Sequence, residues 1–369
     1  MSHEIREIEN LDDFLALAPA WDACLAASGR DSMFLTSAWL AAWWRAHGRG
    51  RSLRVLAAFS GERLVAGAPL CSGPGRYYGV PLRETCFVGD GTSDRQGFPV
   101  LPGHEAALDA IWRRLRGEPR GSAIVRLEEM RADEPAVARG RAVWPALESE
   151  HASWLPYLDL TPGWAAIEAG LPRKYRSEMR TRTKVFDAWG DWSFRQFRGG
   201  DVLAHLDETA AIERASHKTA EGRTFYGDPR NLDFMRRLLA EPGPLAPLLS
   251  VLEVRGAAVA YLLGFVHDGV YHAYNTAHLP GFEKGSPGKW VMHRTVQACA
   301  EDGLLGFDFL RGASYMKSRF RPEERPNARA VAFGRGPVPA LLRLAVFRVR
   351  PRLLRYRKAS ATAPAAEAE

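Results

Sequence analysis

The chain has 369 residues, which exceeds the usual size of one domain and favours two domains or two fused subdomains. Hydrophobic residues make up 46% and charged residues 25%, which is typical of a folded protein and excludes a largely disordered chain. The formal net charge of +7 favours anionic partners, such as a cofactor phosphate, a tRNA or a membrane surface.

The cysteine spacing indicates a reducing compartment, and the N-terminal residues bear on targeting. The four cysteines are scattered without CxxC spacing, so we expect neither a zinc site nor a disulfide framework. Residues 1–13 are acidic and lack the apolar core of a signal peptide, and no apolar run reaches the roughly 18 residues of a transmembrane helix. The sequence therefore predicts a soluble, cytoplasmic protein that needs no metal ion.

Two predicted helices open the chain. Residues 11–27 have helical spacing that Pro19 is expected to interrupt. Ser37 can cap a second helix, and the tryptophans of this helix repeat at helical spacing. We interpret these side chains as core rather than as the wall of a ligand groove: Trp39, Trp43 and Trp44.

A hairpin follows, with strands predicted at residues 53–59 and 63–70 around a Ser-Gly-Glu turn. The same design returns at residues 248–254 and 257–266, where two apolar strands flank an Arg-Gly turn. A repeat at this long interval indicates two copies of one fold rather than a short-period solenoid.

The segment between the hairpins completes the first copy. Residues 89–97 form a polar loop, for which a surface turn is the simplest interpretation. Residues 104–117 predict a helix and residues 123–127 a strand. Residues 128–150 have no clear period, so we place the end of the first copy there.

A strongly basic helix is predicted at residues 172–189, after a strand at residues 157–160. Its cations are Arg173, Lys174, Arg176, Arg180, Arg182 and Lys184. They form either a solvated face or a positive wall that faces a phosphate-bearing donor or acceptor. If a tRNA is the donor, this helix is the natural contact for its backbone, and binding should weaken steeply with salt.

A helix at residues 205–216 leads into a polar loop at residues 217–223. His217 in this loop is a candidate general base, because the unperturbed pKa of histidine lies near working pH. The alternative is an ordinary loop histidine without a catalytic role.

The stretch at residues 270–312 predicts a strand, a glycine-containing loop, a helix at residues 289–301 and a second strand. The first backbone N–H groups of such a helix lack intrahelical partners and can bind an anion. Gly285 and Gly288 let the backbone approach that anion, and Lys289 adds a positive charge. Alternatively, the glycines serve only as turn residues.

The tail beyond Pro337 differs in character from the rest of the chain. Residues Ala340 to Lys358 mix apolar residues with many arginines and no acid, which predicts an amphipathic basic helix. This helix either lies on an anionic membrane surface or packs on the domain and faces solvent. Residues 360–369 are expected to be disordered.

Several catalytic motifs are absent from the sequence. There is no GxSxG elbow, no GxxxxGK[ST] phosphate loop and no HExxH metal motif. A transfer reaction in which the site has only to hold two substrates, orient them and remove a proton needs none of these motifs.

Short motifs in a fixed order along residues 30–335 resemble a known family. They are Phe34-Leu35-Thr36-Ser37-Ala38-Trp39-Leu40 with Trp43-Trp44, Leu171-Pro172-Arg173-Lys174-Tyr175-Arg176, Ser286-Pro287-Gly288, Phe307-Asp308-Phe309, Gly312 and Tyr315-x-Lys317. The sequence resembles the BioF2-like, or CelD-like, acetyltransferases, a branch of the GNAT acyltransferases related to FemAB-like aminoacyl transferases. The resemblance implies an α/β fold with a mixed sheet and two tandem GNAT-like subdomains, residues 1–150 and 151–336, followed by a tail at residues 337–369.

The resemblance also implies an activity, which is transfer of an acetyl or longer acyl group from acyl-CoA, acetyl-CoA included. The acceptor is expected to be an amine or hydroxyl of a small molecule or saccharide, in polysaccharide or cell-envelope biosynthesis. One alternative is a FemAB-like transferase that uses aminoacyl-tRNA. Another is a non-catalytic accessory protein of polysaccharide biosynthesis. Peripheral contact with the inner membrane through the basic tail is compatible with each.

Site residues follow from the same resemblance. The cofactor pyrophosphate is expected on Gly285, Ser286, Pro287, Gly288 and Lys289. The catalytic candidates are Asp308 as acceptor-orienting residue or base, Tyr315 as hydrogen-bond donor, Lys317 as ligand of an anionic group, and His217 as base. A capping or ion-paired Asp308 is the structural alternative. The substrate contacts are expected at Asp94, whose follower Arg95 departs from the family pattern, and at Arg176 and Arg223.

Overall fold

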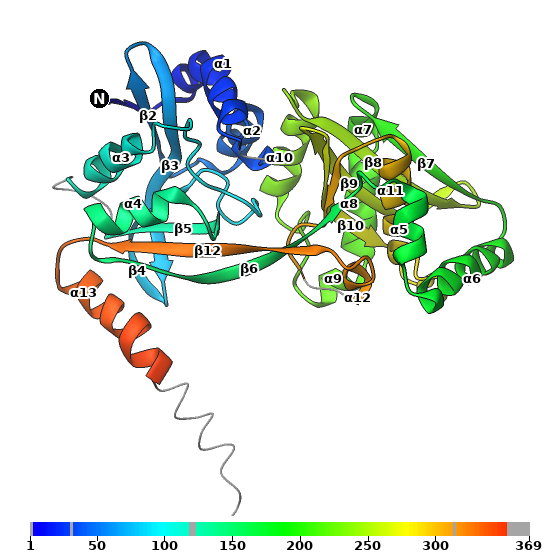
Figure 1. The fold of residues 1–369 in the computed structure, drawn as a ribbon. Helices are drawn as coiled ribbons and strands as arrows, with labels where there is room; N and C mark the ends of the chain where they lie inside the picture. The colour runs from blue at the N-terminus through cyan, green and yellow to red at the C-terminus, as the bar shows by residue number, and fades with distance from the viewer. Residues whose placement is uncertain (1–2, 30–31, 118–122, 313–314, 353–369) are drawn as a thin grey trace, which may run out of the picture.

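The computed structural model describes the chain apart from residues 1–2, 30–31, 118–122, 313–314 and 353–369 (Figure 1). Its strands are β1 Glu4–Ile8, β2 Ser52–Ser60, β3 Arg63–Tyr77, β4 Val80–Phe87, β5 Ile124–Arg131, β6 Leu147–Asp159, β7 Trp192–Arg198, β8 Ala246–Val254, β9 Ala257–His267, β10 Val270–His278, β11 Gly306–Asp308 and β12 Glu323–Phe333. Its α-helices are α1 Leu11–Ala27, α2 Ser37–His47, α3 Ala106–Arg116, α4 Pro135–Val143, α5 Trp164–Gly170, α6 Arg173–Trp189, α7 Asp201–Ala204, α8 Leu206–Ala215, α9 His217–Ala220, α10 Pro229–Ala240, α11 Pro287–Glu301, α12 Tyr315–Ser318 and α13 Pro337–Leu344. Short helical turns lie at η1 Met33–Leu35, η2 Glu283–Gly285 and η3 Ala345–Val349.

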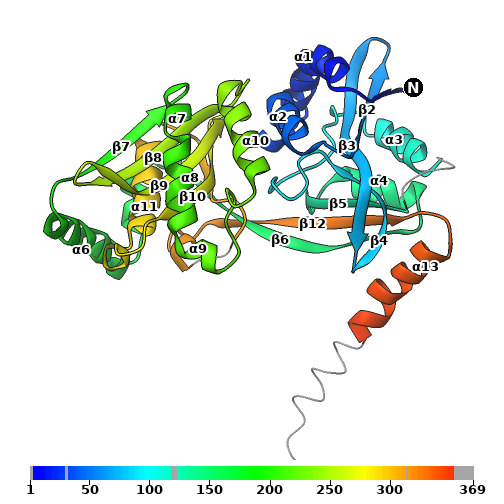
Figure 2. The same cartoon turned by 180° about the vertical axis from the view of Figure 1, so that it is seen from behind.

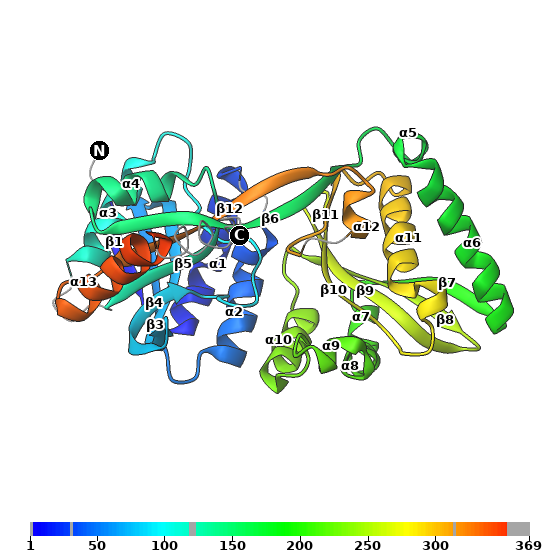
Figure 3. The same ribbon diagram turned by 90° about the horizontal axis from the view of Figure 1, so that it is seen from below.

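All described strands belong to one mixed sheet in the order β1-β2-β3-β4-β5-β12-β6-β11-β10-β9-β8-β7. The long strands β6 and β12 pair with each other and run from one half of the molecule into the other (Figure 3). Helices α11 and α8 cover opposite faces of the second half-sheet, as the front and back views show (Figure 2).

The two halves repeat one arrangement, as the sequence predicts. Strands β2, β3 and β4 form an antiparallel meander, helix α3 follows, and β5 then pairs parallel to β4. Strands β8, β9 and β10, helix α11 and strand β11 repeat this order. The mixed α/β fold with two tandem halves is therefore confirmed.

One hydrophobic cluster spans the two halves. Trp39 of α2 packs edge-to-face on Phe234 of α10, with ring centroids 4.9 Å apart, and on Tyr274 of β10 at 5.2 Å. Trp39 and Trp43 are buried and Trp44 is partly buried against the same cluster. Their interpretation as core is confirmed, and the packing fixes how the two halves meet.

Two local predictions near the N-terminus are wrong. Pro19 does not interrupt α1, because a proline removes one backbone hydrogen bond while tertiary packing of the flanking turns holds the helix together. Thr36, not Ser37, caps α2: its hydroxyl accepts from the N–H of Trp39, whereas the Ser37 hydroxyl donates to Asp22.

The segment at residues 128–150 is also more ordered than predicted. It contains α4 and the start of β6, and residue 150 falls inside β6. The predicted strand at residues 157–160 is the end of this longer strand. The pattern was hidden because β6 is exposed at several positions near its middle and so lacks a clean apolar alternation.

The basic tail begins as predicted. Helix α13 buries Pro339 and Leu342, and Leu342 belongs to a hydrophobic cluster with Tyr77 and Phe333. The expected helix from Ala340 to Lys358 is described only to Arg352, and its remainder and residues 360–369 lie outside the described residues. Among the described helices, none has the length and apolar character needed to cross a membrane.

Candidate functional site

Strands β10 and β11 part after a short stretch of pairing. They pair only through Val270, Tyr271 and His272, opposite Gly306, Phe307 and Asp308. Strand β10 continues to His278 along β9, with a bulge between Ala273 and Asn275. Within the described part of the chain, the other edge of β10 then has no strand partner. Its backbone groups can therefore pair with an extended ligand.

The bulge residue Tyr274 is anchored to the other half. Its hydroxyl donates to the carbonyl of Thr92 at 2.9 Å, and its ring packs against Phe225 and Trp39. Burial raises the pKa of Tyr274 well above its ordinary value, so the phenol stays protonated. The backbone of β10 at the bulge is thereby held in place.

The loop after β10 ends in the N-terminus of α11. Ser286 has φ +47°, in the left-handed region, and Pro287 follows at the first helical position. The backbone N–H groups of Gly288 and Lys289 belong to the first turn, which leaves them without intrahelical acceptors. An anion placed beside this turn can accept from them and interact favourably with the helix dipole.

The two glycines of the loop differ in what surrounds them. A Cβ added to Gly285 would lie 2.2 Å from the Trp189 ring and 2.6 Å from Phe186, so this glycine is needed for packing against α6. A Cβ on Gly288 would meet only Nδ1 of His278, at 3.5 Å. The predicted close approach to an anion therefore has open space at Gly288 but not at Gly285.

Helix α6 places positive charge beside the loop. Lys289 is 2.7 Å from Glu178, and Arg182 donates to the carbonyl of Lys284. One face of α6 forms a concavity of about 660 Å³, which we call the donor hollow: Arg173, Lys174, Ser177, Glu178, Thr181 and Arg182. Arg182 of the basic helix therefore interacts with Glu178 and the loop, whereas other cations of the helix are exposed at the surface.

His217 lies at the loop end of β10. It begins the short helix α9, and its ring centroid is 5.4 Å from that of His278. Burial and the neighbouring His217 lower the pKa of His278. His278 lies six positions along the strand from His272, a length of roughly 20 Å. The structure therefore does not bring His217 and Asp308 together.

Asp308 ends β11 at the point where the strands part. Its side chain is buried, and its Oδ1 accepts from the N–H of Leu310 at 2.8 Å. Its Oδ2 lies 3.9 Å from Nδ1 of the buried His272. Leu310 has φ +54°, so the carboxylate also stabilises a strained turn.

Lys317 is committed to the same turn. Its ammonium donates to the carbonyls of Phe309, Leu310 and Arg311 at 2.8, 3.2 and 3.0 Å. Burial lowers the pKa of Lys317 to about 8, against the opposing effects of Asp94 and Asp308. The side chain of Tyr315 lies outside the described residues.

A partly buried polar network joins this turn to the first half. Asp94 accepts from the backbone N–H and the guanidinium of Arg311, and Glu129 accepts from Arg311 at 3.1 Å and from Asn327 at 2.9 Å. Burial raises the pKa of Asp94, although Arg311 opposes the shift. Glu129 has φ +54°, a second strained residue in the network. The interpretation of the Asp94 loop as a surface turn is therefore wrong, because long-range contacts bury it.

The two predicted substrate arginines lie elsewhere. Arg223 is exposed and pairs with the neighbouring Glu221. Arg176 faces a different concavity from the donor hollow. Sequence reasoning missed His272 and His278; the available signal was the pair of histidines in one predicted strand.

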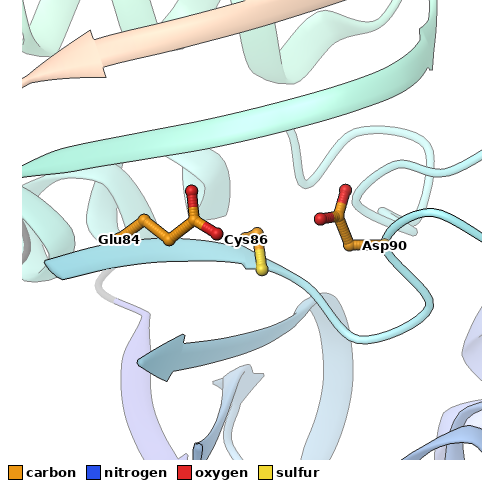
Figure 4. A group of neighbouring side chains, drawn as sticks. All are labelled: Glu84, Cys86 and Asp90. Atoms are coloured by element: carbon orange, nitrogen blue, oxygen red, sulfur yellow. The ribbon is translucent and has the colours of Figure 1, made fainter. Parts of the chain in front are cut away.

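The corresponding region of the first half contains Glu84, Cys86 and Asp90, whose ligand-type atoms lie within 4.8 Å of one another (Figure 4). Arg126 binds both carboxylates, at 3.1 Å from Glu84 and 2.8 Å from Asp90. Arg51 donates to the sulfur of Cys86 at 3.2 Å. Because arginine charges already balance these acids, the group does not call for a metal ion.

Comparison with known proteins identifies the fold. Residues 173–318 match the family model of the acetyltransferase (GNAT) domain. Among solved structures, FemX is similar with a TM-score of 0.64 at 10% identity, over 92% of this chain and 100% of that chain. A tandem GNAT protein from the clavulanic acid biosynthesis pathway gives 0.51 at 14% identity, over 91% and 100% of the two chains.

The C-terminal domain (DUF2156) of a protein described as a lysylphosphatidylglycerol synthetase, from Agrobacterium fabrum, gives a TM-score of 0.58 at 16% identity, over 92% of this chain and 96% of that chain. A search of curated proteins finds no match. At these identities the structural likeness establishes the fold alone, which is the fold of GNAT-type acyl and aminoacyl transferases.

Proposed function

We propose that this protein transfers an acetyl or longer acyl group from acyl-CoA to an amine or hydroxyl acceptor. One observation carries the proposal. The parallel strands β10 and β11 part after His272 and Asp308, and β10 leads to the first N–H groups of α11, which have no intrahelical acceptors. This arrangement suits an extended thioester arm that ends in a pyrophosphate.

The donor is placed along this edge. Its pyrophosphate accepts from the N–H groups of Gly288 and Lys289, and the cations of the donor hollow attract its remaining phosphate. Its pantetheine arm pairs with the β10 backbone between His278 and the bulge at Tyr274. The thioester then lies at the bulge, where a backbone N–H can stabilise the developing oxyanion.

The acceptor attacks at the same place. Its nitrogen or oxygen bonds to the thioester carbonyl carbon, the carbon–sulfur bond breaks, and the CoA thiolate leaves. The proton released by the acceptor passes to a base. We propose Asp308 for this role, with His272 beside it, since both lie where the strands part.

Under this proposal Lys317 positions the turn after Asp308 and does not bind an anionic group of the substrate. Its ammonium donates to three carbonyls of the turn after Asp308, and Asp94 holds Arg311 of that turn. Both are therefore proposed as positioning residues. His217 is proposed to contact the donor phosphates rather than the acceptor proton. A saccharide acceptor rests on the family resemblance alone.

A second candidate donor is aminoacyl-tRNA, and one observation favours it. Helix α6 exposes several cations, Arg173, Lys174, Arg180 and Lys184, which form no ion pair within the described residues. Such a row suits a nucleic-acid backbone.

The tail supports a further proposal, that of contact with an anionic membrane surface. Helix α13 and the following turn expose Val338, Leu341, Leu344 and Val349, and no acid occurs between residues 337 and 358. Apolar side chains beside arginines favour an anionic bilayer. Sedimentation with vesicles of phosphatidylglycerol and phosphatidylcholine, compared with phosphatidylcholine alone, tests this. Equal binding to both, or equal binding by Leu341→Glu, would contradict it.

Thermal unfolding of the full chain tests the donor. A ligand that binds only the folded state raises stability by about 2.7 kcal/mol at 100 times its dissociation constant. We expect this upward shift with acetyl-CoA or a longer acyl-CoA. Salt-sensitive binding of aminoacyl-tRNA without a response to CoA would select the second donor. No response to either would favour the non-catalytic alternative.

A further inference from the structure

A concavity separate from the donor hollow lies between α5, α6, β7 and α11. It has a volume of about 460 Å³, which is within the range of small-molecule sites. We call it the aromatic pocket, and its lining is Trp164, Glu168, Arg176, Met179, Arg180, Thr183, Trp192, Phe194, Trp290, His293, Arg294 and Gln297.

Helix α6 separates the aromatic pocket from the donor hollow. Arg176 and Arg180 of α6 line the aromatic pocket, whereas Ser177 and Thr181 of α6 line the donor hollow. Since each residue advances the helix by 100°, the two groups lie on different faces of α6. Figure 3 shows α6 on the side of α11 that lies away from the first half. A ligand in it does not occupy the proposed donor path.

The pocket contains buried polar atoms that need a partner. His293 is 7% exposed, and its Nδ1 has no hydrogen-bond partner within the described residues. The same holds for Nε of Arg176 and of Arg294. A buried polar atom without a partner costs about 1–3 kcal/mol, so such atoms usually mark a place for a ligand or water. The three residues that carry these atoms line one concavity.

The charge of the pocket selects an anion. Arg176 and Arg180 of α6 and Arg294 of α11 face a single carboxylate, that of Glu168 on α5. Burial, and secondarily Arg294, lowers the pKa of His293 to about 4, so this ring is neutral at pH 7. The lining therefore has a surplus of guanidinium groups, which bind carboxylates and phosphates through paired hydrogen bonds.

The walls of the pocket select a planar group. Trp164, Trp192, Phe194 and Trp290 contribute aromatic surface, and Trp192 and Trp290 meet edge-to-face at 5.3 Å. The Arg294 guanidinium lies 5.7 Å from the centroid of Phe194 and 5.9 Å from that of Trp290. Aromatic rings and guanidinium planes are the groups on which a flat ring stacks.

We propose that the aromatic pocket binds a small aromatic anion, a flat ring that carries a phosphate or carboxylate and is no larger than a mononucleotide. The ring stacks among the tryptophans, and the anion pairs with Arg176, Arg180 and Arg294. The site is additional to the proposed acyl-donor path. It does not depend on which donor the protein uses.

Isothermal titration of the full chain with a defined panel tests the proposal. The panel holds AMP, UMP, phenyl phosphate and indole-3-acetate, with adenosine, uridine and inorganic phosphate as half-ligands. We expect at least one aromatic anion to bind. The nucleosides and inorganic phosphate, which each carry only the ring or only the anion, should bind at least 10-fold more weakly. The phosphate and carboxylate members identify the anion. Binding by none of the four aromatic anions would overturn the proposal.

Matched arginine variants locate the site. Arg294→Gln and Arg180→Gln, at a more exposed position, should each lower the affinity for the aromatic anion at least 10-fold. Arg173→Gln, on the donor hollow, should leave this affinity unchanged. Arg294→Gln should keep the thermal shift with acetyl-CoA, so a failed donor proposal and a failed pocket proposal give different results. Equal weakening by Arg173→Gln, or displacement of the anion by saturating acetyl-CoA, would assign binding to the donor path and overturn the proposal.

Discussion

The parallel strand pair of the first half, β4 with β5, and that of the second half, β10 with β11, occupy equivalent places in one repeated design. In the first half the strands pair through Glu84 and Thr85 and then separate around Arg126, which binds Glu84 and Asp90. In the second half the strands part at His272 and Asp308, whose side chains lie 3.9 Å apart, and Lys317 donates to the carbonyls of the turn after β11. In the first half an arginine bound to two carboxylates lies where the strands part, whereas in the second half β10 has no strand partner beyond His272 within the described residues.

The helices α3 and α11, which connect the strands of these two pairs, differ in the charge of their first turns. Helix α3 has an acid in its first turn, Asp109, and the preceding Glu105 accepts from the N–H of Gly103. The first turn of α11 has no acid and carries Lys289. An acidic helix start repels a phosphate and a basic one attracts it. The GNAT family match likewise covers residues 173–318 of the second half.

The largest expected difference between the halves is catalytic. Asp308→Asn keeps an oxygen that can accept from Leu310 and removes the base, so we expect kcat to fall by about 10²–10⁴-fold at unchanged fold. Steady-state kinetics with the acyl-CoA that raises stability, and circular dichroism for the fold, measure this. Asp90→Asn in the first half is the control, with kcat within about 2-fold of wild type. Full turnover by Asp308→Asn would remove Asp308 from the mechanism.

The next largest effect concerns stability and lies in the first half. Glu84→Gln breaks a buried pair and leaves the Arg126 charge less compensated, so the free energy of unfolding should fall by about 3 kcal/mol. Urea denaturation checks this, and kcat of the folded fraction should be retained. If Glu84→Gln lowers kcat as much as Asp308→Asn does, the first half takes part in catalysis and the comparison fails.

Acid should lower the stability of the second half through His293 of helix α11. The buried face of α11 includes His293, whereas the buried residues of α3 are all apolar. Burial lowers the pKa of His293 to about 4 from an ordinary value of 6.5. Between these values the unfolded chain binds the proton and the folded chain does not, so stability falls as pH drops from 6.5 to 4, by up to about 3 kcal/mol.

Chemical denaturation at several pH values measures this loss, and His293→Gln is the control because it cannot titrate. The variant should lose less stability than wild type within this window. Parallel curves for the two proteins would show that His293 does not titrate with a lowered pKa. Charged groups around the ring, Arg176, Arg294 and Glu168, are present in both proteins and cancel in the comparison.

The smallest effects should separate the two loop glycines. Gly285→Ala forces a methyl group against Trp189 and Phe186, so the free energy of unfolding should fall by about 1–3 kcal/mol. Gly288→Ala meets only His278 at 3.5 Å and should leave stability unchanged or slightly raised, yet weaken acyl-CoA binding several-fold by blocking its phosphate. Unchanged acyl-CoA affinity in Gly288→Ala would place the phosphate elsewhere.

Sequence reasoning succeeded where local pattern and long-range contacts agree. The hairpins, the strand at residues 270–279, the basic helix and the glycine loop with its helix were all predicted near their observed bounds. It failed at Pro19 and along β6, because packing of neighbouring elements outweighs one broken helical bond or a weak alternation. Strand β12, which connects the halves, was not predicted for the same reason.

By itself, the sequence determined the repeat, the strand–loop–helix order and the positive charge, because each is a property of consecutive residues. Only the tertiary structure showed that Asp94 meets Arg311, that His272 faces Asp308, and that His217 lies near His278 rather than near Asp308. These pairs join residues far apart in the chain or on different strands, and strand register and the packing of the two halves set their distances. Whether a strand pair stays open or closes around an arginine is likewise decided by which side chains the fold brings into it.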